Sequence, residues 1–259
     1  MIKSILRFAL SKISRPWLIR ASYVVSPFLS WYYKGHQFED PIDQKTYRSL
    51  LPYGYEGHQR KNALAPGSLS LERHRLLWLY LKRHTELFNP HIPQIMLHVA
   101  PEQCFLKRFK KLKHLNYITG DLESPIADIK MDLHRIPFKD NSFDIVLCNH
   151  VLEHVRDDKR CMKEIFRVLR VGGWAILQVP ISLKKEETDE DPAITDPEIR
   201  KERFGQYDHV RAYGADYSKR LKAAGFSVYL TNFQQELGQR LINRYCLQND
   251  DPLYICRKC

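Results

Sequence analysis

The sequence predicts an α/β fold with a doubly wound, mostly parallel sheet and helices on both of its faces. Two short, uniformly apolar runs, residues 143–150 (FDIVLCNH) and 174–181 (WAILQVPI), have the pattern of strands buried on both faces. Residues 157–169 between them have helical spacing, and the pair Gly172-Gly173 separates this helix from the second run. Two such strands joined through a helix make a right-handed βαβ unit, so the surrounding sheet is expected to be parallel.

The rest of the chain supplies further elements of the same kind. Residues 123–130 are too few for a crossover helix, so they predict only a turn. In chain order, we expect a helix at 71–88, a strand at 95–102, a basic helix at 103–114, a strand at 115–122, a helix at 215–226, a strand at 227–233, a helix at 234–245 and a strand at 251–258.

Length and composition favour one large α/β core with an appendage. The chain has 259 residues, 44% of them hydrophobic, which is enough for one such core but not for two full domains. We expect an N-terminal arm at 1–37, a second segment with a helix at 38–90 and the main domain at 91–259. An acidic insertion at 184–214 within that domain is expected to form a lid. Six scattered cysteines fit a reducing compartment and therefore a cytoplasmic location.

The arm is basic and amphipathic. The net charge of the chain is +11, and no acidic residue precedes Glu39, which favours an anionic partner surface. Residues 2–13 place apolar side chains on one helical face and basic ones on the other. Residues 17–33 are apolar too, but Arg20 and Pro27 interrupt them, so they predict no membrane span. Two alternatives stay open: an interfacial foot at the inner face of the membrane, or an arm packed on the main domain.

The second segment contains two similar short turns. Asp40-Pro41-Ile42-Asp43 and Ala65-Pro66-Gly67-Ser68 have the spacing of zinc-ribbon knuckles, but none of the ligand positions holds cysteine. The spacing predicts a ribbon-like shape without zinc, and we expect no metal site in the chain. An ordinary linker is the alternative.

One continuous stretch carries a family resemblance. In residues 130–181, the turn PFKDNSFD, the segment LEHV and a Gly-Gly turn follow one another in order. This stretch resembles class I S-adenosylmethionine-dependent methyltransferases of the type 11 kind, with the likeness covering about residues 95–182. The resemblance implies a Rossmann-like sheet of seven strands, ending in an antiparallel hairpin, and S-adenosylmethionine as the cofactor. The sequence departs from the family pattern at residues 100–104. A glycine-rich turn is expected there, but the chain has Ala100, Pro101, Glu102 and Cys104.

The resemblance also implies a set of cofactor contacts. Asp121 stands where the family holds both ribose hydroxyls, because a carboxylate accepts from two hydroxyl donors at once. Asp132 would accept from the adenine amine and Leu133 would lie against the ring. The cofactor-binding residues implied in this way are His98, Ala100, Pro101, Glu102, Asp121, Leu122, Met131, Asp132, Leu133, Asn149 and His150.

Catalytic candidates follow from position and residue type. Ligands bind at the carboxyl ends of parallel strands, where the polar cluster of Asn149, His150, Glu153 and His154 is expected. Histidine suits proton transfer near neutral pH, so His150, His154 and the insertion's His209 are candidate bases. A structural histidine bonded to a backbone carbonyl is the alternative at His150 and His154.

The insertion is also expected to contact the substrate. Asp208, Arg211 and Tyr213 are the candidate substrate-binding residues, since arginine can clamp a phosphate or carboxylate. The open alternative is that Asp208 and Arg211 only fix the lid.

The resemblance implies methyl transfer from S-adenosylmethionine to an acceptor that the sequence does not identify. The acceptor is expected to be a small molecule, a glycan or a lipid, with an anionic membrane surface as a further partner of the arm. A NAD-dependent enzyme is disfavoured because no GxGxxG motif follows any strand. Two alternatives remain: an inactive methyltransferase fold that binds a partner, and a nucleic-acid-binding protein. Nucleic acid is the partner that the sequence favours least.

Overall fold

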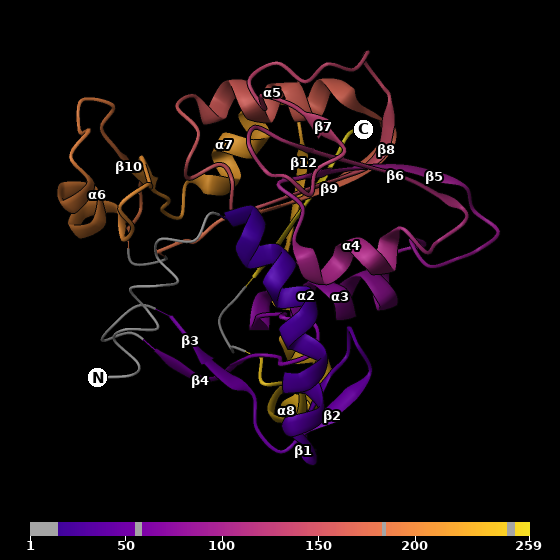
Figure 1. Ribbon diagram of the computed structural model, residues 1–259. Helices are drawn as coiled ribbons and strands as arrows, with labels where there is room; N and C mark the ends of the chain where they lie inside the picture. Colours follow the sequence, from indigo (N-terminus) through magenta and orange to yellow (C-terminus); the bar gives the residue numbers. More distant parts are fainter. Residues whose placement is uncertain (1–14, 55–58, 183–184, 248–251) are drawn as a thin grey trace. The chain divides into compact units, whose positions relative to one another are not determined.

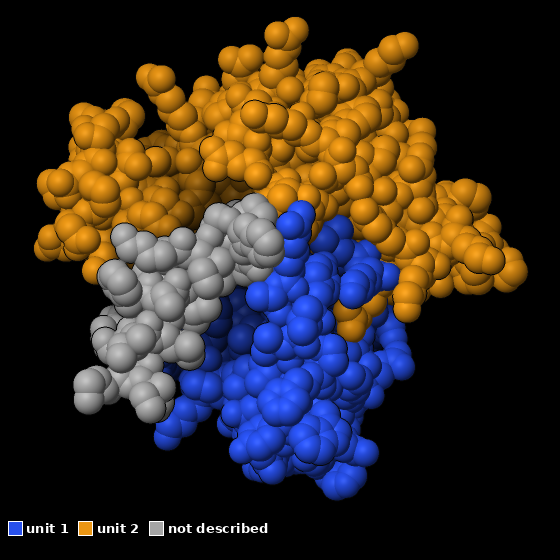
Figure 2. All heavy atoms as spheres, in the orientation of Figure 1, with its two compact units in different colours: residues 1–85, 103–107, 233–251 blue, residues 86–102, 108–232, 252–259 orange. Residues whose placement is uncertain are grey.

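A computed structural model describes residues 15–54, 59–182, 185–247 and 252–259 (Figure 1). The described residues divide into two compact units, coloured separately in Figure 2. Unit 1 takes its described residues from 1–85, 103–107 and 233–251, and unit 2 from 86–102, 108–232 and 252–259. The helix expected at residues 2–13 lies outside the described residues.

Unit 2 is built on a seven-stranded, mostly parallel sheet. Its strands are β5 (Gln94–Val99), β6 (Leu115–Asp121), β7 (Ile129–Lys130), β8 (Phe143–Asn149), β9 (Leu169–Gln178), β12 (Ser227–Thr231) and β13 (Leu253–Arg257). They lie in the order β12-β13-β9-β8-β5-β6-β7. The five strands from β9 to β7 are parallel, and β13 runs antiparallel to both β9 and β12. This order confirms the Rossmann-like fold and the antiparallel final hairpin.

Strand β8 is buried on both faces, as is typical of a central strand in a parallel sheet. Val146 and Cys148 pack on one face with α5 (Asp158–Val168) and α7 (Tyr217–Ala223). Ile145 and Leu147, which point to the opposite face, are fully buried as well. A strand buried on both faces needs a covered sheet, which crossover connections provide. Helix α5 begins after Asp157, whose carboxylate accepts a hydrogen bond from the backbone N–H of Arg160.

The two glycines after α5 have a different role from the expected one. Strand β9 begins at Leu169 directly after the helix, so Gly172 and Gly173 lie inside the strand rather than in a break before it. Gly172 has φ 80°, and a Cβ on Gly173 would lie 2.9 Å from the carbonyl oxygens of Asp144 and Arg170. The pairing of β8 with β9 shifts register at this place. The glycines therefore allow an irregular strand pairing that a side chain would obstruct.

The connection between β6 and β7 has no regular secondary structure, whereas the insertion at 184–214 has some. The chain between β6 and β7 forms only turns, as the sequence predicts. The described residues of the insertion at 184–214 form β10 (Asp189–Glu190), α6 (Pro197–Phe204) and β11 (Arg211–Ala212), with β10 and β11 paired antiparallel. The insertion thus has secondary structure of its own, and its role as a lid stays a prediction.

Unit 1 combines helices with two small hairpins. Its elements are α2 (Arg15–Tyr32), β1 (Lys34–Asp40), β2 (Lys45–Tyr47), β3 (Leu51–Tyr53), β4 (Arg60–Leu64), α3 (Glu72–His84) and α8 (Gln234–Tyr245), while α4 (Gln103–Phe109) has residues in both units. Strands β1 and β2 pair antiparallel, as do β3 and β4. None of the helices in the described part of the chain combines the length and apolar character needed to cross a bilayer.

The two knuckle-like turns of unit 1 share one backbone geometry. The N–H of Gln44 donates to the carbonyl of Asp40 and the N–H of Leu69 donates to the carbonyl of Ala65, each at 2.9 Å. Gln44 and Leu69 both have φ near +60°. The hydroxyl of Tyr47 donates to the carboxylate of Asp43 at 2.5 Å. A zinc-free ribbon stays a prediction for this segment.

Arg75 connects three parts of unit 1. Its guanidinium is fully buried and donates to the carbonyl oxygens of Ala63, Ser70, Tyr245 and Cys246 at 2.7–3.0 Å. Burial lowers the pKa of Arg75. One side chain thereby joins the end of β4, the turn before α3 and the end of α8.

Replacing Arg75 with methionine is expected to destabilise unit 1 strongly. Arg75→Met would remove the donor from the carbonyls of two buried residues, Ala63 and Ser70, and from those of the half-buried Tyr245 and Cys246. The free energy of unfolding should therefore fall by at least about 3 kcal/mol. Urea unfolding followed by circular dichroism measures it. The exposed Arg240 offers the control, because Arg240→Met should change stability by less than about 0.5 kcal/mol. Equal stabilities of the two variants would contradict the role of Arg75.

Candidate active site

A partly buried polar network joins three parallel strands of unit 2, near the carboxyl ends of β5 and β8. His98 on β5 is fully buried, and its Nδ1 lies 2.7 Å from the hydroxyl of Tyr117 on β6. Its Nε2 pairs with the carboxylate of Glu102, whose other oxygen accepts a hydrogen bond from Asn149 Nδ2 on β8 at 3.1 Å. The network therefore fixes the strand ends relative to one another. Within the described residues, the Oδ1 of Asn149 is buried without a hydrogen-bond partner.

The turn after β5 keeps a backbone conformation that suits glycine. Ala100 has φ 49°, and its N–H donates to the carbonyl of Gly120 at 2.9 Å. The left-handed region is rare for residues with a Cβ and natural for glycine. A residue with a Cβ therefore occupies a backbone conformation here that is natural for glycine.

Asp121 stands at the carboxyl end of β6, beside that turn. Its Oδ1 accepts hydrogen bonds from the backbone N–H groups of Glu123 and Ser124, at 2.7 and 2.6 Å. These bonds orient the carboxylate, and Oδ2 accepts no bond within the described part of the chain. The neighbouring Leu122 is 54% exposed, so an apolar surface lies next to an oriented acid.

The expected adenine segment divides between surface and core. The carboxylate of Asp132 is exposed and accepts hydrogen bonds from the backbone N–H and the Nδ1 of His134, at 2.9 and 2.7 Å. The backbone hydrogen bond lowers the pKa of Asp132, so the group is ionised at neutral pH. Met131 and Leu133 are buried members of the hydrophobic core. A cofactor role for these three residues stays a prediction.

A second cluster forms where the loop after β8 meets the insertion. The Nδ1 of His150 lies 3.3 Å from Glu153 Oε1, and the side chain of Glu153 is only 2% exposed. The rings of His154 and His209 meet edge to face with centroids 4.8 Å apart. The backbone N–H of Val210 donates to the carbonyl of Glu153 at 3.0 Å, which joins the two segments.

Hydrogen bonds assign the protons on two of these histidines. The Nδ1 of His209 lies 3.1 Å from the carbonyl oxygen of Phe204, and the Nδ1 of His154 lies 3.3 Å from that of Asp208. A carbonyl oxygen can only accept, so each Nδ1 carries a hydrogen, and Nε2 is the nitrogen with a lone pair when the ring is neutral. Burial lowers the pKa of His209, which keeps this imidazole neutral at pH 7.

Arg211 holds the loop that carries Glu153 and His154. Its guanidinium is buried and donates to the carbonyls of Leu152 and Val155, at 2.7 and 2.6 Å, and to that of Arg156 at 2.9 Å. Its Nε donates to the carboxylate of Glu190 at 3.0 Å. These bonds support the alternative in which Arg211 fixes the insertion, and substrate binding by Arg211 stays a prediction.

Tyr213 reinforces the same loop. Its hydroxyl lies 2.8 Å from Asp158 Oδ2 and 3.2 Å from the carbonyl of Leu152. Burial, together with the charge of Asp158, raises the pKa of Tyr213, so the phenol stays protonated and donates. The expectation that it contacts substrate stays a prediction as well.

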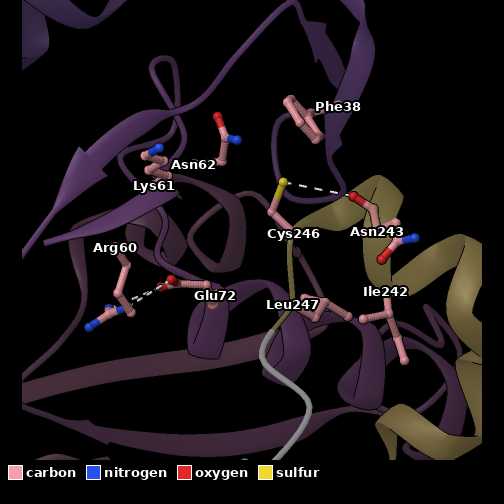
Figure 3. Close-up of a pocket in the computed structure, with 9 residues that line it drawn as sticks. All are labelled: Phe38, Arg60, Lys61, Asn62, Glu72, Ile242, Asn243, Cys246 and Leu247. Atoms are coloured by element: carbon pink, nitrogen blue, oxygen red, sulfur yellow. Dashed lines mark hydrogen bonds and ion pairs between the residues drawn. The ribbon is translucent and has the colours of Figure 1, made fainter.

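Unit 1 contains a separate cavity of about 430 Å³ (Figure 3). In its wall, the guanidinium of Arg60 donates two hydrogen bonds to the carboxylate of Glu72, at 2.9 and 3.2 Å. Asn62 in its wall accepts a hydrogen bond from the backbone N–H of Leu50. Lys61 and Cys246 line the same cavity, and the thiol of Cys246 donates to the carbonyl of Asn243.

Comparison with known proteins assigns the central part of the chain. Residues 82–177 match a family model described as a methyltransferase domain. This segment is a methyltransferase domain. It includes the three strand ends, Asp121 and the loop with His150, Glu153 and His154, and enzymes of this class use S-adenosylmethionine as their methyl donor.

Individual relatives match over short stretches. A 58-residue stretch of the chain is 50% identical to the uncharacterized protein MJ0638 of Methanocaldococcus jannaschii, covering 22% of this chain and 25% of that protein. A 60-residue stretch is 38% identical to cycloartenol-C-24-methyltransferase 1 of Oryza sativa subsp. japonica, covering 23% of this chain and 17% of that enzyme. The chain thus spans a quarter or less of the length of these two relatives.

Solved structures include similar folds. Phosphoethanolamine N-methyltransferase 2 of Haemonchus contortus, solved with S-adenosyl-L-methionine, has a TM-score of 0.46 and 16% sequence identity. The match covers 71% of this chain and 52% of that one. At these values the likeness carries no argument about the reaction.

The structure brings the sequence-predicted site residues of unit 2 into two groups. His98, Ala100, Glu102, Asp121 and Asn149 lie at the strand ends. His150, His154, Asp208 and His209 gather around Glu153. Tyr117 and Glu153 belong to these groups without being predicted site residues, although Glu153 lies in the polar cluster expected from the sequence.

Tyr213→Phe tests the fixing of the loop in this domain. The substitution removes the donor to Asp158 and should lower the free energy of unfolding by about 1–3 kcal/mol, because a buried charged acceptor loses a bond. Thermal and urea unfolding give the value. Tyr207, which is 55% exposed, supplies the matched control, and Tyr207→Phe should leave stability unchanged. A Tyr213→Phe variant as stable as the wild type would show that the hydroxyl has no such role.

Proposed function

We infer that the protein is an S-adenosylmethionine-dependent methyltransferase. One observation carries this inference. The oriented Asp121 carboxylate and the left-handed turn at Ala100 lie next to each other, at the ends of adjacent parallel strands in the segment that matches the methyltransferase domain. Parallel α/β sheets bind ligands at this edge.

The residues present fit the methyl donor. Asp121 would accept from both ribose hydroxyls, since Oδ2 is not bonded within the described residues and Oδ1 faces its own turn. The exposed Leu122 would cover part of the adenosine. The turn at Ala100 would bring backbone close to the methionine part, and the buried Asn149 Oδ1 offers an acceptor for a polar donor there. Bound in this way, the cofactor supplies an electrophilic methyl group on a sulfonium.

The chain's own contribution is alignment and proton removal. Because methyl transfer is a displacement at carbon, the acceptor atom would have to be held in line with the donor's methyl group. An oxygen acceptor loses its proton in this step. His150 would take it through Nε2, because its Nδ1 lies 3.3 Å from the buried Glu153 carboxylate. The acceptor is proposed to be a small molecule, a glycan or a lipid.

Asp121→Asn tests the cofactor site. Isothermal titration with S-adenosylmethionine and S-adenosylhomocysteine should give micromolar binding to the wild type. Affinity should fall roughly 100-fold in the variant, which corresponds to about 3 kcal/mol for two weakened charge-assisted bonds. Asp140, whose side chain is 69% exposed, gives the control, and Asp140→Asn should bind both ligands like the wild type.

Two results would overturn the assignment. No binding of either ligand to the folded wild type would favour the alternative of an inactive fold that binds a partner. Binding that survives Asp121→Asn unchanged would show that the cofactor lies elsewhere.

A further inference from the structure

We propose that Glu153, His154 and His209 bind one divalent transition-metal ion beside the cofactor site. The three side chains lie in unit 2, and one ligand atom from each lies within 4.8 Å of the others. They come from two segments, the loop after β8 and the insertion, that the hydrogen bond from Val210 to Glu153 joins. In the part of the chain that the structure describes, this is the one group of three such residues with this spacing.

The hydrogen bonds behind the two histidines are those of metal ligands. A ligating histidine normally donates its other ring N–H to a carboxylate or backbone carbonyl, which fixes the tautomer and the ring. His209 donates from Nδ1 to the carbonyl of Phe204. His154 has the carbonyl and the carboxylate of Asp208 at 3.3 and 3.4 Å from its Nδ1. Both rings are therefore held with the Nε2 lone pair as the remaining donor.

The carboxylate of Glu153 completes the set. Its side chain is only 2% exposed, and Oε2 is buried with no hydrogen-bond partner among the described residues. Leaving a buried carboxylate oxygen unsatisfied is unfavourable, and a cation would remove that cost. Oε1 already faces His150, so Oε2 is the atom left for a metal.

The donor set indicates the kind of ion and its role. Two imidazoles and one carboxylate are the ligands of catalytic zinc sites and of related sites for iron, manganese or cobalt. Tetrahedral ligands at about 2.0–2.1 Å from a metal lie roughly 3.4 Å apart, so rotamer-scale movements of about 1 Å would close the site. Three protein ligands leave a coordination position open, which distinguishes such a site from a structural one.

The open position indicates the acceptor class. Resting on the proposed function, the ion would bind a hydroxyl oxygen of the acceptor and make its proton more acidic, in reach of His150 on the same loop. The protein would then be an oxygen methyltransferase. The metal-binding inference itself does not depend on this step.

Cobalt titration tests the site directly. The full chain, carrying Cys259→Ser because Cys259 is an exposed thiol, is treated with a chelator and titrated with Co²⁺. We expect one ion per chain with the weak visible bands of nitrogen and oxygen ligands and without an intense thiolate band. Zn²⁺ should displace the cobalt, and elemental analysis should confirm the stoichiometry.

Matched variants locate the ion. Glu153→Gln and His209→Gln should each weaken Co²⁺ binding at least 100-fold, while the exposed His91→Ala should bind like the wild type. Both glutamine variants should keep the circular dichroism spectrum and the S-adenosylmethionine affinity of the wild type, which shows that the domain is folded.

The outcomes separate the two proposals. A folded wild type that binds no Co²⁺ or Zn²⁺ tighter than millimolar, or binding unaffected by both glutamine variants, overturns the metal site. Metal binding without S-adenosylmethionine binding supports the metal site and overturns the proposed methyl transfer.

Discussion

The candidate site depends on one buried guanidinium. Arg211 binds the three carbonyls of the loop after β8 that would otherwise need water, and thereby gives a single shape to a segment with no regular secondary structure. The same short stretch of chain carries His209, two residues earlier. One local arrangement therefore positions side chains from both the loop and the insertion, which is how a site made of loops can reach the precision that chemistry requires.

The two groups of polar residues are supported in different ways. The residues at the strand ends inherit their positions from the sheet, because neighbouring parallel strands are held in register and the network through His98 connects them. The cluster around Glu153 depends on side-chain bonds to backbone carbonyls. A change in the sheet would disturb the first group, whereas a change in the insertion would disturb the second and leave the first in place.

The sequence contained most of the fold and only part of the site. Uniformly apolar runs were sufficient for β8 and β9, and the short link before β7 was sufficient to exclude a helix there. The glycines at 172 and 173 were assigned to a break because spacing cannot show that they lie opposite another strand's carbonyl. Strand-end positions such as Asp121 follow from the chain order alone. The meeting of His154 with His209 does not, because it depends on how a separate insertion folds back.

Helix α6 has a consequence beyond its own segment. The carbonyl of Phe204 in its last turn is one of the groups that a helix leaves unsatisfied, and it receives the hydrogen of His209. The end of a surface helix therefore decides which nitrogen of a buried imidazole is reactive. A substitution that shifts the end of α6 would therefore act on the proton of His209 without changing any strand of the sheet.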